Sequence, residues 1–338
     1  MTTTAPRIDD APPAATPRRR RGRLRTLTRR DKFVIAAMLG VPLVIDAAFI
    51  WFPALASVGL SFTKWTGVGG VHLQSCASLP SVPGIPQPGC LYGVQNYHQA
   101  FTNYPDFWPA VQHNFFWLLV FMFIATPLGM LFAVIIDRGI RGSRIYQSVL
   151  FLPVMLSLAL IGIIWELIYS NNYGLINSVL GRTGNNNLID WLGDPHLNLW
   201  ALLVEASWRQ AGYVMVLYLA GLKSVDPALR EAALVDGANP WQTFWRVIFP
   251  AMRPINIVVS VVTVIESLRA FDLVYITSGG GGNSLKGLEL LSVAVTQNIV
   301  GETQRIGFGS TLGVILLVIS LVPITIFLFQ AFRREESR

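Results

Sequence analysis

The stretch EAALVDGANPWQTFWRVIFP, residues 231–250, is a polar segment between two apolar segments that are each long enough to cross a lipid bilayer. Asp226, which is followed by a proline, can cap a short helix, and Gly237 stands where helices commonly end in a left-handed residue. Asn239, again followed by a proline, can start a second helix. The sequence therefore predicts two short helices, hinged at Gly237, that a membrane protein holds in the cytosol.

The composition indicates an all-α integral membrane protein. Of the 338 residues, 52% are hydrophobic and 13% are charged, whereas roughly 25% of the residues are charged in a soluble globular protein. A helix of about 20 apolar residues spans the roughly 30 Å hydrocarbon core of a bilayer. Six segments have this length, at residues 33–55, 115–136, 149–168, 200–222, 255–276 and 306–332. The sequence thus predicts six transmembrane helices with both termini on one side.

The positions of the 26 Lys and Arg residues predict which side is the cytosol. If the N-terminus is cytosolic, twenty of them lie in cytosolic segments and four in external ones, in agreement with the positive-inside rule. Residues 1–32 then form a basic, disordered cytosolic tail, and residues 333–338 form a cytosolic C-terminus. A cleaved signal peptide is the alternative for the first segment, but the apolar stretch exceeds the roughly 7 to 15 residues of such signals. The net charge of +7 is explained by anionic lipid headgroups and topology, without nucleic acid.

Residues 57–112 form a long external loop in this topology, and the loop carries both cysteines, Cys76 and Cys90. Thiols on the outer side of a cell membrane face an oxidising compartment. We therefore expect a disulfide between these two residues that closes part of the loop. Two free cysteines without a role are the alternative.

Several motifs resemble permease subunits of ATP-binding-cassette (ABC) importers, in particular the maltose-type sugar permeases. Four residues match the EAA pattern of that family: Glu231, Ala232, Ala233 and Gly237. Gly93–Tyr97 resembles its G-x-x-N-Y segment, and Tyr173–Asn177 is similar to a segment just outside its third span. The likeness extends over residues 33–332 except for the Cys-bearing insertion in the external loop, and it implies a type I ABC importer permease fold with six transmembrane helices. An ordinary amphipathic cytosolic linker is the alternative for residues 231–250.

The resemblance implies a non-catalytic, multi-pass subunit of the bacterial cell (inner) membrane that forms half of a translocation pathway for a sugar. In that family the EAA loop, here within residues 223–253, is a coupling helix that seats on an ATPase subunit. Its implied contact residues are Glu231, Ala232, Ala233, Asp236, Gly237 and Ala238. The implied partners are a second, different permease subunit, two ATPase subunits that bind ATP and Mg, an external substrate-binding protein and membrane lipid. No cofactor is expected in the chain itself.

Charged residues at bilayer depth are rare and mark candidates for function. Glu205 and Arg209 are four residues apart, and Glu266 and Arg269 are three apart, so each pair shares a helix face. For Glu205 and Arg209, a structural salt bridge and a contact with the solute both remain open. The resemblance to maltose-type permeases puts Glu266, Ser267 and Arg269 near the sugar. We therefore predict a substrate pathway formed by these five residues.

Other functions compete with sugar transport. The solute can instead be another polar compound, such as a glycerol phosphodiester, and a membrane-embedded enzyme built on the charged clusters is a further alternative. The sequence has no G-x-x-x-x-G-K-[ST] phosphate loop, and its 4 histidines show no zinc spacing. We therefore expect neither ATP hydrolysis nor a metal site in this chain.

Overall fold

The structure is a computed structural model of the 338-residue chain, and it describes residues 28–76, 89–182, 188–277, 287–301 and 304–333. Most of the predicted tail and of the predicted C-terminal segment lies outside these described residues. The chain divides into two compact units, Met1–Pro53 and Ala54–Arg338, and each is described by itself.

The described part of the first unit is helical. α1 (Arg29–Asp46) begins with a capping box, in which Thr28 Oγ1 accepts a hydrogen bond from the Asp31 backbone N–H and Asp31 Oδ2 accepts one from the Thr28 N–H. The helix continues through the π-helical turn η2 (Ala47–Trp51) into α2 (Phe52–Leu60). This run of 32 residues is long and apolar enough to cross a membrane, and it contains the predicted span 33–55.

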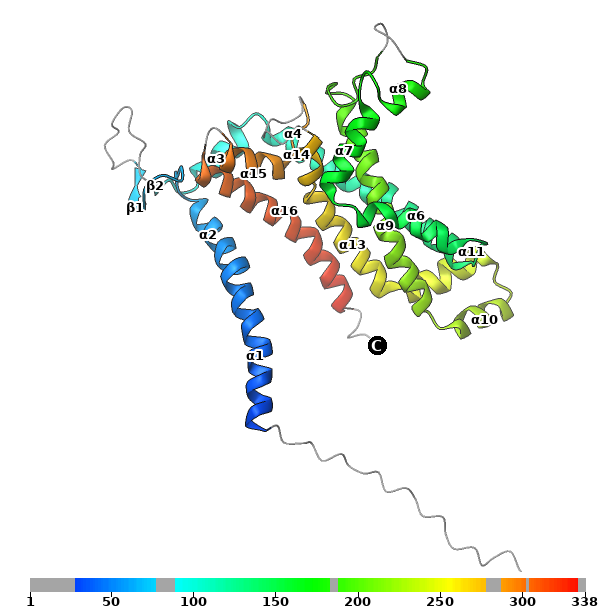
Figure 1. Cartoon of the computed structure of the whole chain (residues 1–338). Helices are drawn as coiled ribbons and strands as arrows, with labels where there is room; N and C mark the ends of the chain where they lie inside the picture. Colours follow the sequence, from blue (N-terminus) through cyan, green and yellow to red (C-terminus); the bar gives the residue numbers. More distant parts are fainter. Residues whose placement is uncertain (1–27, 77–88, 183–187, 278–286, 302–303, 334–338) are drawn as a thin grey trace, which may run out of the picture. The chain divides into compact units, whose positions relative to one another are not determined.

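The second unit is a helical bundle with one small sheet (Figure 1). After α2 its first elements are β1 (Val71–Ser75), β2 (Gly89–Leu91), α3 (Gln95–Thr102), α4 (Phe107–Val120), η4 (Phe121–Ala125), α5 (Thr126–Asp137) and α6 (Ser143–Met155). Its middle elements are α7 (Leu158–Tyr169), α8 (Leu175–Val179), α9 (Asn198–Ser224), α10 (Pro227–Val235), α11 (Pro240–Thr243), η5 (Phe244–Ile248) and α12 (Phe249–Ala251). Its last are α13 (Arg253–Leu268), α14 (Asp272–Thr277), α15 (Leu291–Val300) and α16 (Ile306–Arg333). In Figure 1, α8 and α10 lie at opposite ends of the long helix α9.

Three described helical runs are long and apolar enough to span a membrane: Arg29–Leu60, Phe107–Asp137 and Ile306–Phe327. Two pairs of bent helices raise the number to five by length and composition if each pair is counted as one span. α9 contains the predicted span 200–222 but carries Glu205 and Arg209, and it is not among these runs. The predicted number of six spans therefore stays a prediction, whereas a helical protein with several apolar spans is confirmed.

The predicted span 149–168 is not one straight helix. α6 and α7 meet at a bend of 102°. The bend arises because Leu156 has an extended backbone and Ser157 caps α7, its side chain accepting a hydrogen bond from the Leu160 N–H. Pro153, inside α6, also lacks the N–H that a continuous helix uses. The predicted span 255–276 is divided as well, into α13 and α14, at residues 269–271.

The all-α prediction is corrected by two strands in the loop that was predicted to be external. β1 and β2 pair in parallel, with Val71 opposite Gly89 and Ser75 opposite Leu91. The predicted disulfide is present between Cys76, which directly follows β1, and Cys90 within β2. The disulfide joins the two strands at one end, which brings their backbones close enough to pair. The loop residues between Cys76 and β2, 77–88, lie outside the described part of the chain.

Buried polar side chains connect the end of α2 to the start of α16. The backbone oxygen of Ser61 accepts hydrogen bonds from Asn96 Nδ2 at 2.9 Å and from Thr311 Oγ1 at 3.0 Å. The Gly307 N–H donates to the Trp65 backbone oxygen at 2.9 Å. Because buried carbonyl groups need partners, these bonds fix the chain where it leaves α2, and residues separated by most of the sequence meet there.

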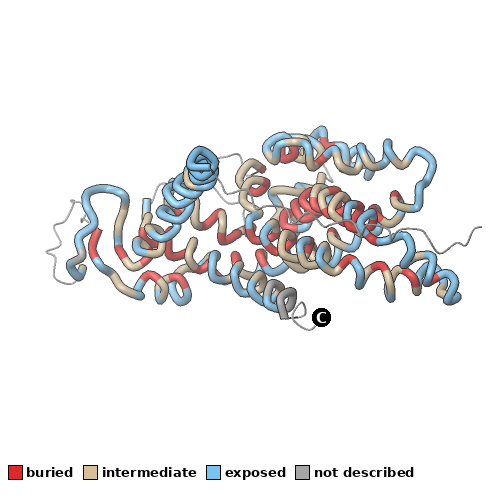
Figure 2. Tube along the Cα trace, turned by 90° about the horizontal axis from the view of Figure 1, so that it is seen from below, coloured by how far each residue is buried: buried red, intermediate tan, exposed pale blue. Residues whose placement is uncertain are grey.

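α5 and α9 form the most extensive helix pair of the bundle. A Cβ atom at Gly129 of α5 would lie 2.6 Å from the backbone oxygen of Ala211 on α9, so only glycine permits this close approach. The hydrophobic cluster around the pair extends into η5 and α13: Ala133, Ile136, Val214, Met215, Tyr218, Leu219, Leu222, Val225, Ile248, Met252 and Val259. Figure 2 shows buried positions in red on the inner sides of the helices and exposed positions in pale blue on the outer sides.

Candidate functional site

Two short helices, α10 and α11, occupy the stretch that the sequence analysis singled out. Asp226 caps α10 because its Oδ1 accepts a hydrogen bond from the Ala228 N–H at 2.9 Å. α11 starts with a capping box, in which Asn239 Oδ1 accepts from the Gln242 N–H and Gln242 Oε1 accepts from the Asn239 N–H. These local bonds define both helix starts without any contribution from the rest of the bundle.

α10 ends in a Schellman motif. The N–H of Gly237 donates to the Leu234 oxygen at 3.1 Å, and the N–H of Ala238 donates to the Ala233 oxygen at 3.0 Å. Gly237 has a φ of +77°, which is the left-handed conformation that favours glycine. The turn toward α11 therefore depends on the glycine that the sequence predicted as the hinge.

The six predicted contact residues of this loop differ in exposure. Ala233 is buried, and Ala238 is half-buried. Glu231, Ala232, Asp236 and Gly237 are exposed. Three large apolar side chains nearby are also exposed: Leu234 (62%), Val235 (88%) and Trp241 (70%). Apolar side chains this exposed, next to a carboxylate, form a surface suited to a protein partner.

Arg230 connects α10 to two helices of the bundle. Its Nη1 donates to Asp137 Oδ2 on α5 at 2.9 Å, and its Nη2 donates to the backbone oxygen of Leu222 on α9 at 3.1 Å. The ion pair is partly buried, with side-chain exposures of 34% for Arg230 and 15% for Asp137. This contact is not predictable from helix spacing because 93 positions separate the two charged residues.

A cavity of about 120 Å³ lies among α4, α7, α9, α13 and α14. It is lined by Trp117, Phe121, Leu158, Ala206, Arg209, Glu266, Arg269, Ala270, Asp272 and Leu273. Small-molecule sites usually have about 300 to 1,000 Å³. The cavity therefore has the size of part of a ligand site.

The polar wall of the cavity is formed by four charged residues from two stretches of the chain. Arg209 Nη1 on α9 lies 3.3 Å from Glu266 Oε2 on α13, and both side chains are partly exposed, at 24% and 30%. Arg269, within the break between α13 and α14, and Asp272, the first residue of α14, line the same cavity. Two positive and two negative side chains make the wall neutral in sum, with several hydrogen-bond donors and acceptors.

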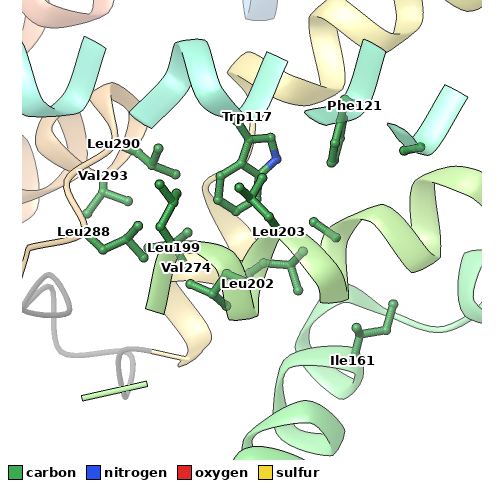
Figure 3. Close-up of a cluster of buried hydrophobic side chains, with 13 residues drawn as sticks. Trp117, Phe121, Ile161, Leu199, Leu202, Leu203, Val274, Leu288, Leu290 and Val293 are labelled. Carbon is green, nitrogen blue, oxygen red and sulfur yellow. The ribbon is translucent and has the colours of Figure 1, made fainter. Parts of the chain in front are cut away.

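The apolar wall belongs to a buried cluster that includes Trp117 from α4, Phe121 from η4 and leucines of α9. Figure 3 shows Trp117 together with Leu199, Leu202 and Leu203, and with side chains of the segment around Leu288. Aromatic side chains beside charged groups give the cavity one flat apolar side and one polar side. Such a combination can hold a molecule that has both hydroxyl groups and C–H faces.

The predicted pathway residues do not all reach the cavity. Arg209, Glu266 and Arg269 line it. Ser267 is buried, and its hydroxyl donates to the Val264 oxygen of its own helix. Glu205 is also fully buried, and neither of its carboxylate oxygens has a hydrogen-bond partner among the described residues. Arg209 thus pairs with Glu266 on another helix and not with Glu205.

Asp272 and the two aromatic residues of the wall were outside the predicted pathway. Asp272 is one of the charged residues within the predicted spans. It lies so far along its span from the cytosolic end that the sequence predicts a position near the outer interface. Trp117 and Phe121 carry no signal in a sequence because aromatic residues are common throughout membrane helices. Among the described residues, no group of three or more His, Cys, Asp or Glu side chains is arranged to hold a metal ion.

The fold and the site define a helical membrane protein with a polar cavity and a separate polar loop. A family model described as "binding-protein-dependent transport system inner membrane component" matches residues 125–337, more than half of the chain. The chain belongs to this family. It is thus a permease subunit of an ABC importer, and the resemblance to sugar-type permeases read from the sequence is confirmed.

Curated relatives extend the match beyond the family model. The osmoprotective compounds uptake permease protein GgtC of Synechocystis is 32% identical over 251 residues, which cover 72% of this chain and 87% of that protein. The xylose/arabinose import permease protein XacH of Haloferax volcanii is 28% identical and covers 92% of both chains. The trehalose/maltose transport system permease protein MalF of Thermococcus litoralis is 29% identical, covering 72% of this chain and 81% of that protein.

A solved structure has the same fold. The chain is similar to a chain in the crystal structure of a bacterial ABC transporter involved in the import of the acidic polysaccharide alginate. The TM-score is 0.70, the sequence identity is 20%, and the alignment covers 90% of this chain and 96% of that one. At this identity the likeness establishes the type I importer permease fold alone.

Proposed function

We propose that the chain forms half of the translocation pathway for a sugar in an ATP-driven importer. The observation that carries this proposal is the cavity between α9 and α13, because it combines aromatic and charged side chains among the helices of the bundle. A volume of about 120 Å³ is too small for a whole sugar. A second, different permease subunit therefore supplies the other half of the site.

The neutral sum of the cavity charges favours a neutral polyhydroxylated solute. Arg209 and Glu266 compensate each other, and Arg269 and Asp272 add one charge of each sign. A glycerol phosphodiester, which is anionic, would leave its charge without a net positive counterpart in this half of the site. It is therefore the second candidate, and an anionic solute requires extra cations from the other subunit.

The other components follow from membership in the family. Two ATPase subunits bind ATP and Mg²⁺, and an external binding protein delivers the solute; this chain itself catalyses no reaction. The α10–α11 loop, with Glu231 and the exposed Leu234, Val235 and Trp241, seats on one ATPase subunit. The loop and both termini lie in the cytosol, and the strands β1 and β2 lie outside a bacterial inner membrane.

The test is to purify the chain with its copurifying subunits, reconstitute the complex in lipid vesicles and measure ATP hydrolysis with a panel of solutes and the binding protein. Neutral mono-, di- and oligosaccharides are expected to include the stimulating compound. Stimulation by glycerol phosphodiesters alone would support the second candidate. Product formation from a solute by the purified chain without ATPase subunits would instead identify a membrane-embedded enzyme.

Coupling is tested at the hinge. Gly237 has a positive φ, so a β-branched residue there strains the turn between α10 and α11. The variant Gly237→Val is expected to retain ATP hydrolysis and to lose most solute uptake. Full uptake by this variant would refute the role of the loop in coupling.

A further inference from the structure

Arg230 is the point at which the α10–α11 loop is attached to the helices of the bundle. We propose that Arg230 is a positioning residue, which makes α10 move as one body with α5 and α9 through its bonds to Asp137 and Leu222. The inference rests on the function proposed above and adds a mechanical connection between the loop and the cavity. Arg230 itself touches neither the cavity lining nor, in this proposal, the solute.

α10 has few other attachments. Of the residues in this helix, Ala233 is the one that is buried. Among the described residues, the side-chain hydrogen bonds that lead from α10 to another helix are the two made by the Arg230 guanidinium. A force applied to the exposed side of α10 therefore reaches the bundle through this guanidinium, through packing against η5 and through the two residues of chain that join α10 to α9.

The two acceptors are groups that need a cation. Asp137 is the last residue of α5, and a carboxylate at the C-terminal end of a helix is unfavourable because the helix dipole is negative there. The Leu222 carbonyl lies in the last turn of α9, where backbone oxygens lack partners within the helix. A planar guanidinium can bind both acceptors at once with separate N–H groups, whereas a lysine ammonium is a single point charge. Arg230 thus joins the ends of two helices that pack along each other.

α9 then connects this attachment to the cavity. Leu222 and Arg209 lie on the same helix, 13 residues apart, which is about 20 Å along the axis. α5 and α9 pack closely at the glycine contact, which couples the two helices. At the other end, Arg209 bonds to Glu266 on α13. A movement of α10 that displaces α9 therefore changes the ion pair in the cavity wall.

The experiment uses the full reconstituted importer and a thiol label in the cavity. Both native cysteines are in a disulfide, so Ala270→Cys, in the cavity lining, introduces one reactive thiol. The rate of maleimide labelling is measured with and without ATP and vanadate. In the Ala270→Cys protein we expect nucleotide to change this rate. No change there would contradict the proposed function itself, before Arg230 is tested.

Arg230→Gln is then added to the Ala270→Cys protein. ATP hydrolysis is expected to continue, while the nucleotide-dependent change in labelling falls by about tenfold, because both bonds are lost. Asp137→Asn removes the ion pair and keeps the Leu222 bond, so it is expected to have a smaller effect. Arg230→Lys is expected to resemble Asp137→Asn. If Arg230→Gln does not assemble with the ATPase subunits, these two milder variants carry the test.

A charge swap separates a positioning role from a contribution to stability alone. The double variant Arg230→Asp with Asp137→Arg restores an ion pair with the two charges exchanged. Its nucleotide-dependent change in labelling is expected to exceed that of Arg230→Asp alone and that of Asp137→Arg alone. An unchanged response in Arg230→Gln or Asp137→Asn would overturn the inference. A double variant no better than the single ones would overturn it as well.

Discussion

Arg230–Asp137 and Arg209–Glu266 are the two ion pairs among the described residues, and they differ in their surroundings. The first is short, at 2.9 Å, and a backbone oxygen takes a second N–H of the same guanidinium. The second is longer, at 3.3 Å, and opens on a cavity with two further charges. The first pair has its hydrogen bonds satisfied within the protein, whereas the second can exchange them with a ligand. One joins helices, and the other forms part of a binding site.

The packing of α9 against α5 lies between the two pairs, and the largest effect is expected there. Gly129→Ala puts a Cβ 2.6 Å from a backbone oxygen and 2.7 Å from Val214 Cβ, so α5 and α9 must separate. We expect a loss of about 3 kcal/mol in stability and a lower midpoint of thermal aggregation in detergent. Gly59→Ala is the control, because no atom lies within 4 Å of the Cβ it adds. Equal midpoints for the two variants would contradict close packing at Gly129.

The second effect concerns Glu205, a carboxylate on the same helix as Arg209 that belongs to neither pair. It is fully buried and its oxygens have no hydrogen-bond partner among the described residues. Methionine has a similar volume without the polar atoms, so Glu205→Met is expected to stabilise the complex by about 2 kcal/mol and to preserve uptake. Glu166→Met, at an exposed position of α7, serves as the control with little expected change. Loss of uptake in Glu205→Met would mean that Glu205 belongs to the substrate pathway, as predicted from the sequence.

The third prediction separates the cavity pair from the attachment pair. Glu266→Gln leaves Arg209 without its ionic partner in a partly exposed site, so binding of the solute is expected to weaken by about tenfold. The half-maximal solute concentration for stimulated ATP hydrolysis measures this change. Asp137→Asn, at the other ion pair, is the matched control and is expected to leave that concentration unchanged. A similar shift in both variants would remove the distinction between the two pairs.

The smallest expected effect is at Ser267, which follows Glu266 in the sequence but does not line the cavity. Its hydroxyl bonds to the Val264 oxygen of its own helix. Ser267→Ala is expected to change stability by less than about 1 kcal/mol and to leave the half-maximal solute concentration unaltered. A clear rise in that concentration would mean that Ser267 contacts the solute, as the sequence analysis predicted.

Local signals in the sequence were sufficient to predict the two helices of the α10–α11 loop and the turn between them. Asp226, Gly237 and Asn239 act on backbone groups within a few residues, so their effect does not depend on the rest of the fold. The pairing of charges was not predictable in the same way. Helix periodicity correctly put Glu266 and Arg269 on one face, but it gave no information on whether Arg209 meets Glu205 or a residue of another helix.

Hydropathy predicted where apolar helices occur but not where they bend. The residues 149–168 are predominantly apolar, and the break depends on one extended residue, Leu156, and on the cap at Ser157. The short apolar helix α15 was also missed because it is too brief to register as a span. Attachment by Arg230 was missed for a further reason, since contacts between distant residues leave no trace in a single sequence.

The junction at Ser61 has a consequence for the biogenesis of the protein. A ribosome delivers the chain from the N-terminus, so α2 enters the membrane long before α16 exists. The backbone oxygen of Ser61 receives its bond from Asn96 early, but the bond from Thr311 forms only after 250 further residues have been made. The attachment at this end of α2 therefore starts with Asn96 and is complete only once α16 has been made.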